Sequence, residues 1–279
     1  MATVFDNPDC PVRTADAVLE VQALHFGYEP KVPVLQGVGG SLSAGRLCAL
    51  IGPNAAGKST LLRLMLGHHR PWSGIVRLGR KDVQALSPAA RAALASYVPQ
   101  RGAAGFTFTV AQVVAMGRHA QRPDPEAVAR ALDTCDLASV MDRPYLHLSA
   151  GQQQRVLLAR AIAQSGGTGR VMLLDEPGSA MDLRHLHRTM KHLRELAAAG
   201  LAVLVVLHDL NLAAHYADDV WLLDEGRLAA RGPVLEVMKP AVLEPVYRMK
   251  LQPIWPEGRD RPIFVAGLGG AETRRHEGN

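Results

Sequence analysis

The sequence predicts an α/β protein with a mainly parallel β-sheet that helices cover on both faces. Two continuously apolar segments, RVMLLDEP (170–177) and LAVLVVLHD (201–209), are typical of strands buried on both faces. Each is followed by a segment whose apolar residues have helical spacing, at 184–200 and 210–217. Because strands that alternate with helices favour parallel pairing, these segments indicate βαβ units.

The N-terminal part of the chain predicts a second, antiparallel sheet. Residues 18–28, VLEVQALHFGY, alternate apolar and polar side chains as a half-buried strand does. Residues 41–52, SLSAGRLCALIG, contain a second strand with SAG as the turn before it, and residues 73–83 form a short strand pair. Between them, LLRLMLG (61–67) has helical spacing and ends at Gly67.

Residues of about 101–169 are expected to form a helical region. Apolar residues recur at helical spacing in 109–120, 125–137 and 149–164, and Pro123 and Pro125 separate the first two helices. Farther on, DVWLLDEGRLAARG (219–232) predicts a hairpin that turns at DEG. Residues 1–17 and 251–279 are expected to be tails, the last of them rich in glycine and charge.

Composition excludes several classes of protein. The chain has 279 residues with 48% hydrophobic residues, which is enough for a core. Its net charge of +5 comes from scattered basic residues, and only 5% of residues are aromatic, so no nucleic-acid partner is expected. The three cysteines are widely spaced, which argues against a disulfide framework or zinc site and fits a reducing cytoplasm. We expect no signal peptide, and no apolar run is long enough to span a bilayer.

The stretch GPNAAGKST (52–60) predicts a phosphate-binding loop between a strand and a helix. Gly52, Gly57, Lys58 and Ser59 meet the pattern G-x-x-x-x-G-K-[ST]. The glycines let backbone N–H groups converge on phosphate oxygens, at the positive end of the following helix. The lysine supplies charge to the terminal phosphates and the serine hydroxyl a ligand for Mg²⁺. We therefore expect ATP and Mg²⁺ to be bound by Gly52, Pro53, Asn54, Ala55, Ala56, Gly57, Lys58, Ser59 and Thr60.

Ala55 departs from the glycine that such loops most often carry at this position. If the position needs a left-handed backbone, alanine costs about 1–2 kcal/mol there. A domain with a stability of about 5–15 kcal/mol tolerates that strain. The sequence therefore predicts that the loop still binds a nucleotide.

Polar residues farther along the chain are candidates for the same site. Asp175 and Glu176 end a buried strand, where the first acid would hold Mg²⁺ and the second would orient or deprotonate an attacking water. His208 follows the next buried strand, and either contacts the γ-phosphate or is hydrogen-bonded locally. Gln100, in SYVPQ, would touch Mg²⁺ or the water. The alternative for the acids is a solvated strand end.

Together the motifs resemble those of the ATP-binding cassette (ABC) ATPases. GPNAAGKST, VPQ, LSAGQQQRVLLARA, LLDEP, SAMD and LHD follow in that family's order, and the resemblance covers about Val18 to Tyr247. The most specific motif is LSAGQ (148–152), close to the signature LSGGQ. The resemblance implies that a second copy of the chain binds the γ-phosphate, through Ser149, Ala150, Gly151 and Gln152.

The resemblance also implies the fold and the roles of individual residues. It implies a RecA-like P-loop NTPase core, an antiparallel β subdomain and a helical signature subdomain of about 101–169 within an ATPase domain of 18–250. Tyr28 is expected to stack on adenine, in preference to Phe26, and Asp182 to link the two nucleotide sites of a homodimer. Glu176 would be the catalytic base and His208 the γ-phosphate switch, while Gly178 stands where many relatives carry threonine or serine.

Further stretches resemble the importer ATPases for ferric siderophores, haem and cobalamin. These are TVAQVVAMGRHA (109–120), HDLNLAA (208–214) and DEGR (224–227), although GRHAQ lacks the Pro-His that often follows the arginine. The resemblance implies a separate permease docked on residues 100–149, a solute-binding protein, and a peripheral position on the cytoplasmic face of the inner membrane. The alternatives are an exporter ATPase and a soluble ABC protein, and the soluble class usually carries a second cassette or coiled-coil insertion that is not present here.

Overall fold

The computed structural model describes residues 17–100, 107–166 and 169–267 of the chain, so parts of the expected tails and of the helical region lie outside the described residues. In chain order the described strands are β1 Ala17–Phe26, β2 Leu35–Ser43, β3 Leu47–Ile51, β4 Ser73–Leu78, β5 Lys81–Asp82, β6 Ala95–Val98, β7 Val171–Leu174, β8 Ala202–Val206, β9 Asp219–Asp224, β10 Arg227–Pro233, β11 Leu251–Ile254 and β12 Ile263–Ala266. The described α-helices are α1 Lys58–Met65, α2 Pro88–Leu94, α3 Val110–Ala115, α4 Pro125–Thr134, α5 Ala150–Ser165, α6 Leu183–Ala198, α7 Leu210–Tyr216, α8 Val234–Val237 and α9 Pro240–Tyr247.

The central sheet has six strands in the order β10-β9-β3-β8-β7-β6. All neighbours from β9 to β6 pair in parallel, and β10 pairs antiparallel with β9 through the turn at Glu225 and Gly226. The predicted parallel sheet and the predicted hairpin at 219–232 are therefore confirmed. The sheet matters for function because the parallel strands bring their carboxyl ends to one edge.

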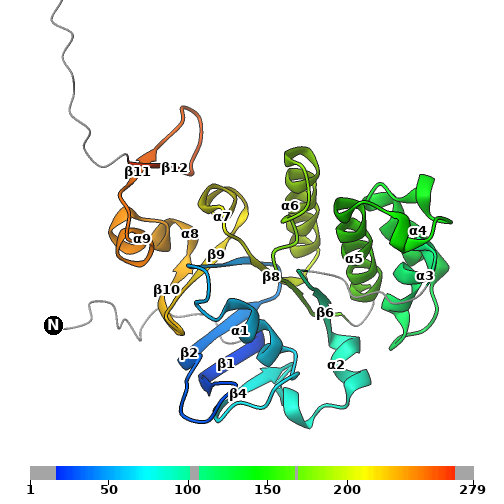
Figure 1. The fold of residues 1–279 in the computed structure, drawn as a ribbon, viewed down its shortest axis with the longest axis horizontal. Helices are drawn as coiled ribbons and strands as arrows, with labels where there is room; N and C mark the ends of the chain where they lie inside the picture. The colour runs from blue at the N-terminus through cyan, green and yellow to red at the C-terminus, as the bar shows by residue number, and fades with distance from the viewer. Residues whose placement is uncertain (1–16, 101–106, 167–168, 268–279) are drawn as a thin grey trace, which may run out of the picture.

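Both faces of this sheet are buried, as the apolar strand sequences predict. Along β3, Leu47, Ala49 and Ile51 pack into one hydrophobic cluster, while Cys48 and Leu50 pack into another. Helices α5, α6 and α7 contribute to the first cluster, and α1 with the four-stranded sheet contributes to the second. Figure 1 shows this arrangement, with α6 and α7 above the sheet and α1 with β1, β2 and β4 below it.

The second sheet has the order β2-β1-β4-β5, with antiparallel pairing throughout. The strands predicted at 18–28 and 73–83 are confirmed. The sequence analysis did not separate β2 from β3, because β2 is rich in glycine and lacks alternation. Its Gly40 meets the ring of Trp221 on the central sheet so closely that an added Cβ would lie 2.5 Å from the ring. The glycine lets the two sheets approach each other.

The C-terminal part is more ordered than the sequence predicts. The expectation of a tail at 251–279 is wrong for residues 251–266, where β11 and β12 pair antiparallel. The side chain of Asn211 on α7 makes two hydrogen bonds to the backbone of Phe264, of 2.7 and 3.1 Å, which fix this hairpin to the core. The short elements α2, β6, α8 and α9 were also not predicted.

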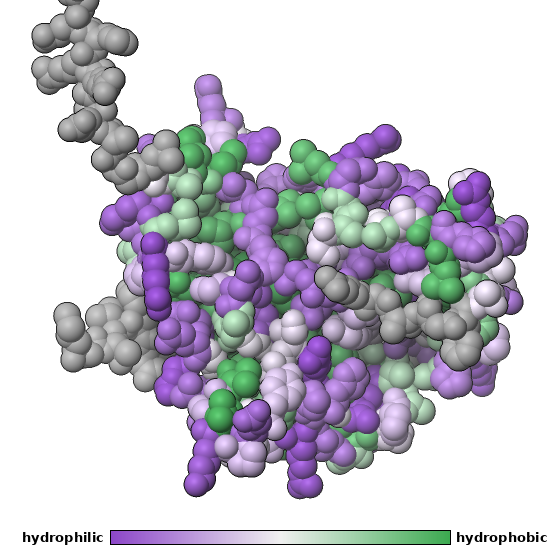
Figure 2. All heavy atoms as spheres, in the orientation of Figure 1, coloured by the Kyte–Doolittle hydropathy of each residue, from purple (hydrophilic) through white to green (hydrophobic). Residues whose placement is uncertain are grey.

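The region of 107–166 is helical, as expected, and lies beside the central sheet (Figure 1). Thr109 and Ser149 begin α3 and α5 with capping boxes, closed by Gln112 and Gln152. Polar and apolar side chains are mixed over the face in Figure 2, which also shows apolar side chains at the C-terminal hairpin. Ile254, Trp255 and Val265 are the large exposed apolar side chains there.

Candidate nucleotide-binding site

The loop of residues 52–57 connects β3 to α1 and is held from behind by the β9–β10 hairpin. Gly52 has φ 145° and lies directly against β9, where an added Cβ would be 2.0 Å from the carbonyl oxygen of Leu223. Gly57 has φ 102° and is the N-cap of α1. The N–H of Gly226 donates to the carbonyl oxygen of Ala56 over 3.2 Å. Both glycines are therefore required by the backbone, as the motif predicts.

Lys58 lies buried across the concave side of the loop. Its Nζ donates to the carbonyl oxygens of Gly52 and Pro53, each over 2.8 Å. Burial lowers the pKa of Lys58, and the nearby charges of Glu176 and Asp175 act in the opposite direction. The lysine thus places a positive charge in the loop, where phosphate oxygens would receive it.

Ala55 adopts the left-handed conformation that the sequence analysis considered, with φ 63°. The residue is exposed, so its methyl group gains little from packing that would offset the strain. The cost is about 1–2 kcal/mol by the general preference of L-residues. With this strained residue the loop still accepts the ammonium group of Lys58 on its carbonyl oxygens of Gly52 and Pro53.

Ser59 and Asp175 bring two oxygen ligands together. The hydroxyl of Ser59 donates to Oδ1 of Asp175 over 3.1 Å. Asp175 is only 3% exposed. Burial raises the pKa of this carboxyl group, and the hydrogen bond from Ser59 lowers it. A hydroxyl beside a carboxylate, next to a phosphate-binding loop, fits the hard oxygen ligands that Mg²⁺ prefers.

Glu176 is held between two other strand ends. Nε2 of His208, after β8, lies 2.5 Å from Oε1 of Glu176. Nε2 of Gln100, after β6, donates to Oε2 over 2.7 Å. Glu176 itself has φ 49°, a backbone conformation that a non-glycine residue rarely adopts. The structure therefore brings together all four polar candidates from three strand ends.

Comparison with known proteins identifies the family of the chain. The family model for the ABC transporter family matches residues 35–179, more than half of the chain. The chain belongs to the ABC transporter family. It contains the family's ATP-binding domain, and it is an ATPase.

Individual relatives align with most of the length of this ABC ATPase. It is 42% identical to the hemin import ATP-binding protein HmuV of Pseudomonas entomophila (strain L48) over 256 residues, which are 89% of the chain and 99% of that protein. It is 40% identical to HmuV of Pseudomonas aeruginosa over 84% of the chain and 94% of that protein. A solved structure of an inward-facing, putative metal-chelate type ABC transporter matches with a TM-score of 0.75 at 28% identity, over 90% of this chain and 97% of that one.

The signature residues of this ABC ATPase form the start of α5. Ser149 is the N-cap, and Gln152 completes the capping box. An added Cβ on Gly151 would lie 2.7 Å from the carbonyl oxygen of Ala180, so only glycine fits this contact between the signature and the segment before Asp182. Within the described residues no hydrogen bond joins the signature to the P-loop.

Asp182 begins α6 as its N-cap and accepts from the backbone N–H of His185 over 2.9 Å. This hydrogen bond and the contact with the His185 ring lower the pKa of the Asp182 carboxyl group. The side chain is exposed, so it remains accessible to a second copy. Its role in linking two sites stays a prediction.

Of the two aromatic candidates for adenine, only Tyr28 has an exposed ring. Tyr28 is 53% exposed, whereas Phe26 is 6% exposed and stacks against His69 at 5.4 Å. The hydroxyl of Tyr28 lies 3.1 Å from Oγ1 of Thr60, at the first turn of α1. This geometry favours Tyr28 over Phe26 as the residue that would stack on adenine, which is the preference that the sequence indicates.

Sequence analysis missed Tyr97 of β6 at the site. Burial and the charge of nearby Asp175 raise the pKa of Tyr97 to about 12, and the pairing of β6 with β7 could have indicated this proximity only if the register were known. Gly178 is explained by the fold, because an added Cβ there would lie 2.3 Å from Cδ1 of Leu186 on α6. The leucine fills the space that a larger residue at position 178 would need.

No helix in residues 17–100, 107–166 and 169–267 is long and apolar enough to cross a membrane.

Proposed function

We propose that the chain is the ATP-hydrolysing subunit of an importer for haem or a related iron chelate. The proposed ATP hydrolysis rests on the position of Glu176, which Gln100 and His208 hold next to Asp175 and Lys58. The substrate class rests on two relatives that are named hemin import ATP-binding proteins. The chain matches nearly the full length of each of them. The solved structure that matches over most of both chains is of a putative metal-chelate type transporter.

The chain's residues divide the binding of Mg-ATP between them. The backbone N–H groups of residues 52 and 54–60 and the ammonium group of Lys58 would hold the β- and γ-phosphates. Ser59, Asp175 and Gln100 would hold Mg²⁺, which neutralises charge on the phosphates when it is bound. The exposed ring of Tyr28 would stack on adenine.

Glu176 is the group that would act on the attacking water. Its carboxylate can accept a proton from water, and the two hydrogen-bonding neighbours fix its direction. His208 would turn from the carboxylate to the γ-phosphate, because its Nε2 can pair with either anion. Such a step would couple the presence of a γ-phosphate to the orientation of Glu176.

A second copy of the chain would complete each site. Ser149 begins a 16-residue helix, and the N–H groups at its start form an anion-binding end. The signature of one copy would meet the γ-phosphate on the loop of the other, with Asp182 between the two sites. ATP then closes the dimer and hydrolysis opens it, because the contacts to the γ-phosphate are lost.

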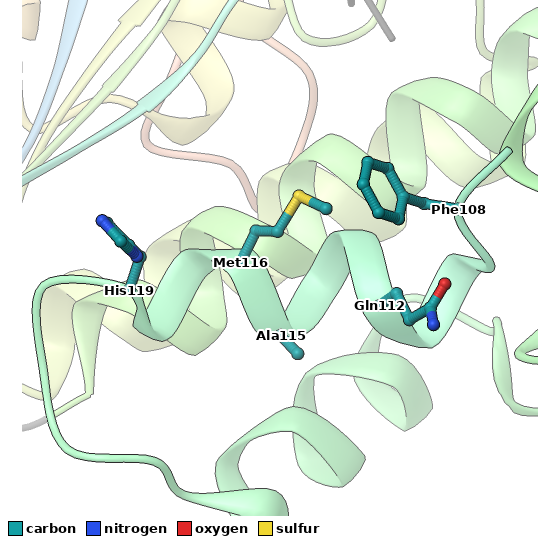
Figure 3. A pocket seen from close by; sticks show the side chains of 5 residues that line it. All are labelled: Phe108, Gln112, Ala115, Met116 and His119. Atoms are coloured by element: carbon teal, nitrogen blue, oxygen red, sulfur yellow. The ribbon is translucent and has the colours of Figure 1, made fainter. Parts of the chain in front are cut away.

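A separate permease would dock on the helical region. An open hollow of about 620 Å³ lies along α3 and the 3₁₀ turn of Met116–Arg118. Figure 3 shows its lining, which combines apolar and polar side chains: Phe108, Gln112, Ala115, Met116 and His119. The ATPase would lie on the cytoplasmic face of the inner membrane, and a solute-binding protein would deliver the substrate from outside.

The proposal is tested by uptake of labelled haem, ferric siderophore and cobalamin into cells that carry the wild type or Glu176→Gln. Glu126→Gln is a matched control, since Glu126 lies exposed on α4. We expect haem or iron-chelate uptake to collapse in Glu176→Gln and to persist in the control. Unchanged uptake of all three substrates would contradict the proposal. Loss of efflux of another solute would instead support the exporter alternative.

A further inference from the structure

Tyr28 lies in the loop between β1 and β2, outside the hydrogen-bond ladder of either strand. The loop is tight at its base. The N–H of Val34 donates to the carbonyl oxygen of Phe26 over 2.7 Å, and an added Cβ on Gly27 would lie 2.0 Å from the carbonyl oxygen of Val32. The backbone at Tyr28 is therefore held in place, and the direction of its ring depends on what the side chain contacts.

Two aromatic rings contact the ring of Tyr28 at nearly right angles. Its centroid lies 5.2 Å from that of Phe26 with an interplanar angle of 80°, and 5.5 Å from that of His69 with an angle of 87°. Phe26 and His69 are stacked on each other, so they form one support for the Tyr28 ring. Tyr28 nevertheless remains exposed, which leaves part of its ring open to a ligand.

The hydroxyl of Tyr28 has two partners on α1. It lies 3.1 Å from Oγ1 of Thr60, and Nη1 of Arg63 donates to it over 3.2 Å. Thr60 and Arg63 are three residues apart on the helix, so their side chains lie on the same face. The end of the ring that is farthest from the backbone is thus attached to the helix that follows the phosphate-binding loop.

Of these two partners, Arg63 is the one outside the proposed phosphate contacts. Thr60 belongs to the proposed loop, so its hydroxyl could turn from Tyr28 to a phosphate oxygen. An arginine donates and does not accept, so the phenol oxygen accepts from Arg63 whichever way the bond between Tyr28 and Thr60 is directed. In the part of the chain that the structure describes, no ion pair draws Arg63 elsewhere. Arg63 can therefore hold the Tyr28 hydroxyl while a nucleotide is bound.

A ring that is already oriented binds a base more tightly than a mobile ring does. The terminal torsion of a tyrosine side chain has broad minima, and ordering an exposed side chain when a ligand arrives costs conformational entropy. A hydrogen bond from a charged donor is directional and stronger than one between neutral groups. The bond from Arg63 therefore fixes the far end of the Tyr28 ring before the base arrives.

We propose that Arg63 is a positioning residue, which holds the Tyr28 hydroxyl and so keeps the ring oriented to stack on adenine. The inference rests on the proposed function and adds a residue to its base-binding part. Arg63 acts through Tyr28. Its loss should therefore weaken the binding of a ligand that has a base, and should leave the binding of a phosphate chain without a base as it is.

The test measures equilibrium binding of two ligands by the full chain, a non-hydrolysable ATP analogue and inorganic tripolyphosphate, which lacks both base and ribose. Arg63 lies one turn after Ser59, so its charge could also act on phosphates directly. A salt concentration of about 0.15 M limits that action, because it screens exposed charges beyond about 8 Å.

For Arg63→Met we expect the affinity for the ATP analogue to fall about 3–10-fold, the size of one hydrogen bond. The affinity for tripolyphosphate should stay at the wild-type value. Tyr28→Phe, which keeps the ring and removes the hydroxyl, should show the same pattern, and in this background Arg63→Met should add no further loss. Arg77→Met is the matched control, because this arginine pairs with Glu20 on the neighbouring strand, and it should bind both ligands as the wild type does.

Three outcomes would overturn the inference. One is an affinity of Arg63→Met for the ATP analogue equal to that of the wild type. Another is an equal loss of affinity for both ligands, which would show that the charge of Arg63 acts on the phosphates. The third is an undiminished effect of Arg63→Met in the Tyr28→Phe background. Failure of the wild-type chain to bind the ATP analogue, or wild-type affinity in Tyr28→Ala, would instead contradict the proposed function, so the two failures are distinguishable.

Discussion

Nε2 of His208 lies 2.5 Å from Oε1 of Glu176, and this contact connects the ends of the neighbouring strands β8 and β7. The Glu176 carboxylate also accepts from Gln100 on its other oxygen. Both oxygens thus have partners from different strand ends. The carboxylate is held at a fixed position, and either partner could release it when it turns to a bound ligand.

Glu176→Gln is expected to bind ATP but to turn it over at least about 100-fold more slowly, the scale lost with a general base. The amide is nearly the same size as the carboxylate and still offers one acceptor to Gln100 or His208. The measurement is ATPase rate together with equilibrium ATP binding. Turnover close to that of the wild type would remove Glu176 from the role of base.

Ala55→Gly is expected to stabilise the fold by up to about 1 kcal/mol, because glycine adopts φ 63° without the Cβ strain. We expect the ATP affinity to change less than the stability, since residue 55 already adopts the left-handed backbone with alanine in place. Chemical denaturation and ATP titration measure the two effects. A large gain in affinity would show that the strain costs binding.

Ala56→Gly is the matched control for this change. Ala56 is buried and has no positive φ, so its replacement should destabilise the fold by about 0.5–1 kcal/mol through backbone entropy. If Ala55→Gly and Ala56→Gly both stabilise the fold, loop flexibility, and not the φ angle of residue 55, controls the stability of the loop.

Gly178→Thr is expected to destabilise the fold by about 1–3 kcal/mol, because the new Cβ would meet Cδ1 of Leu186 at 2.3 Å. Leu186→Ala in the same chain should recover part of that loss, since it vacates the space. The free energy of unfolding of both single variants and the double variant gives the coupling between them. Additive effects would show that the two residues do not compete for this space.

Mild acid is expected to weaken the fold at the α7 surface. Burial, followed by the charges of Arg259 and Arg261, lowers the pKa of His215 below its ordinary 6.5, and the other groups that act on it are His187 and Arg194. The unfolded chain therefore binds a proton at a higher pH than the folded chain does. The stability from neutral His215 is present above pH 6.5 and is lost as the pH falls through the lowered value.

The melting temperature of the wild type and of His215→Gln between about pH 7.5 and 5 measures this contribution. The variant should lose less stability than the wild type as the pH falls, because glutamine does not titrate. Parallel curves for the two proteins would exclude His215 as a source of the acid sensitivity.

How much of this protein the sequence predicts depends on how local each feature is. The phosphate loop, its lysine and serine, and the alternation of buried strands with helices are short-range patterns that backbone geometry imposes on neighbouring residues. They were sufficient for the fold class and for most of the candidate site. The glycine-rich β2 and the short elements near the C-terminus carry no such periodic pattern. For this reason the sequence predicts a tail where β11 and β12 form a hairpin at 251–266.

The sequence by itself determined the chemistry of the site and the parallel sheet that presents it. Only the tertiary structure decided that Gln100 and His208 contact the two carboxylate oxygens of Glu176, and that Phe26 is buried while Tyr28 is exposed. Strand order and register set these relationships, and both follow from packing between segments far apart in the chain. Local propensity carries no information about that packing, because the residues involved become neighbours only when the core forms.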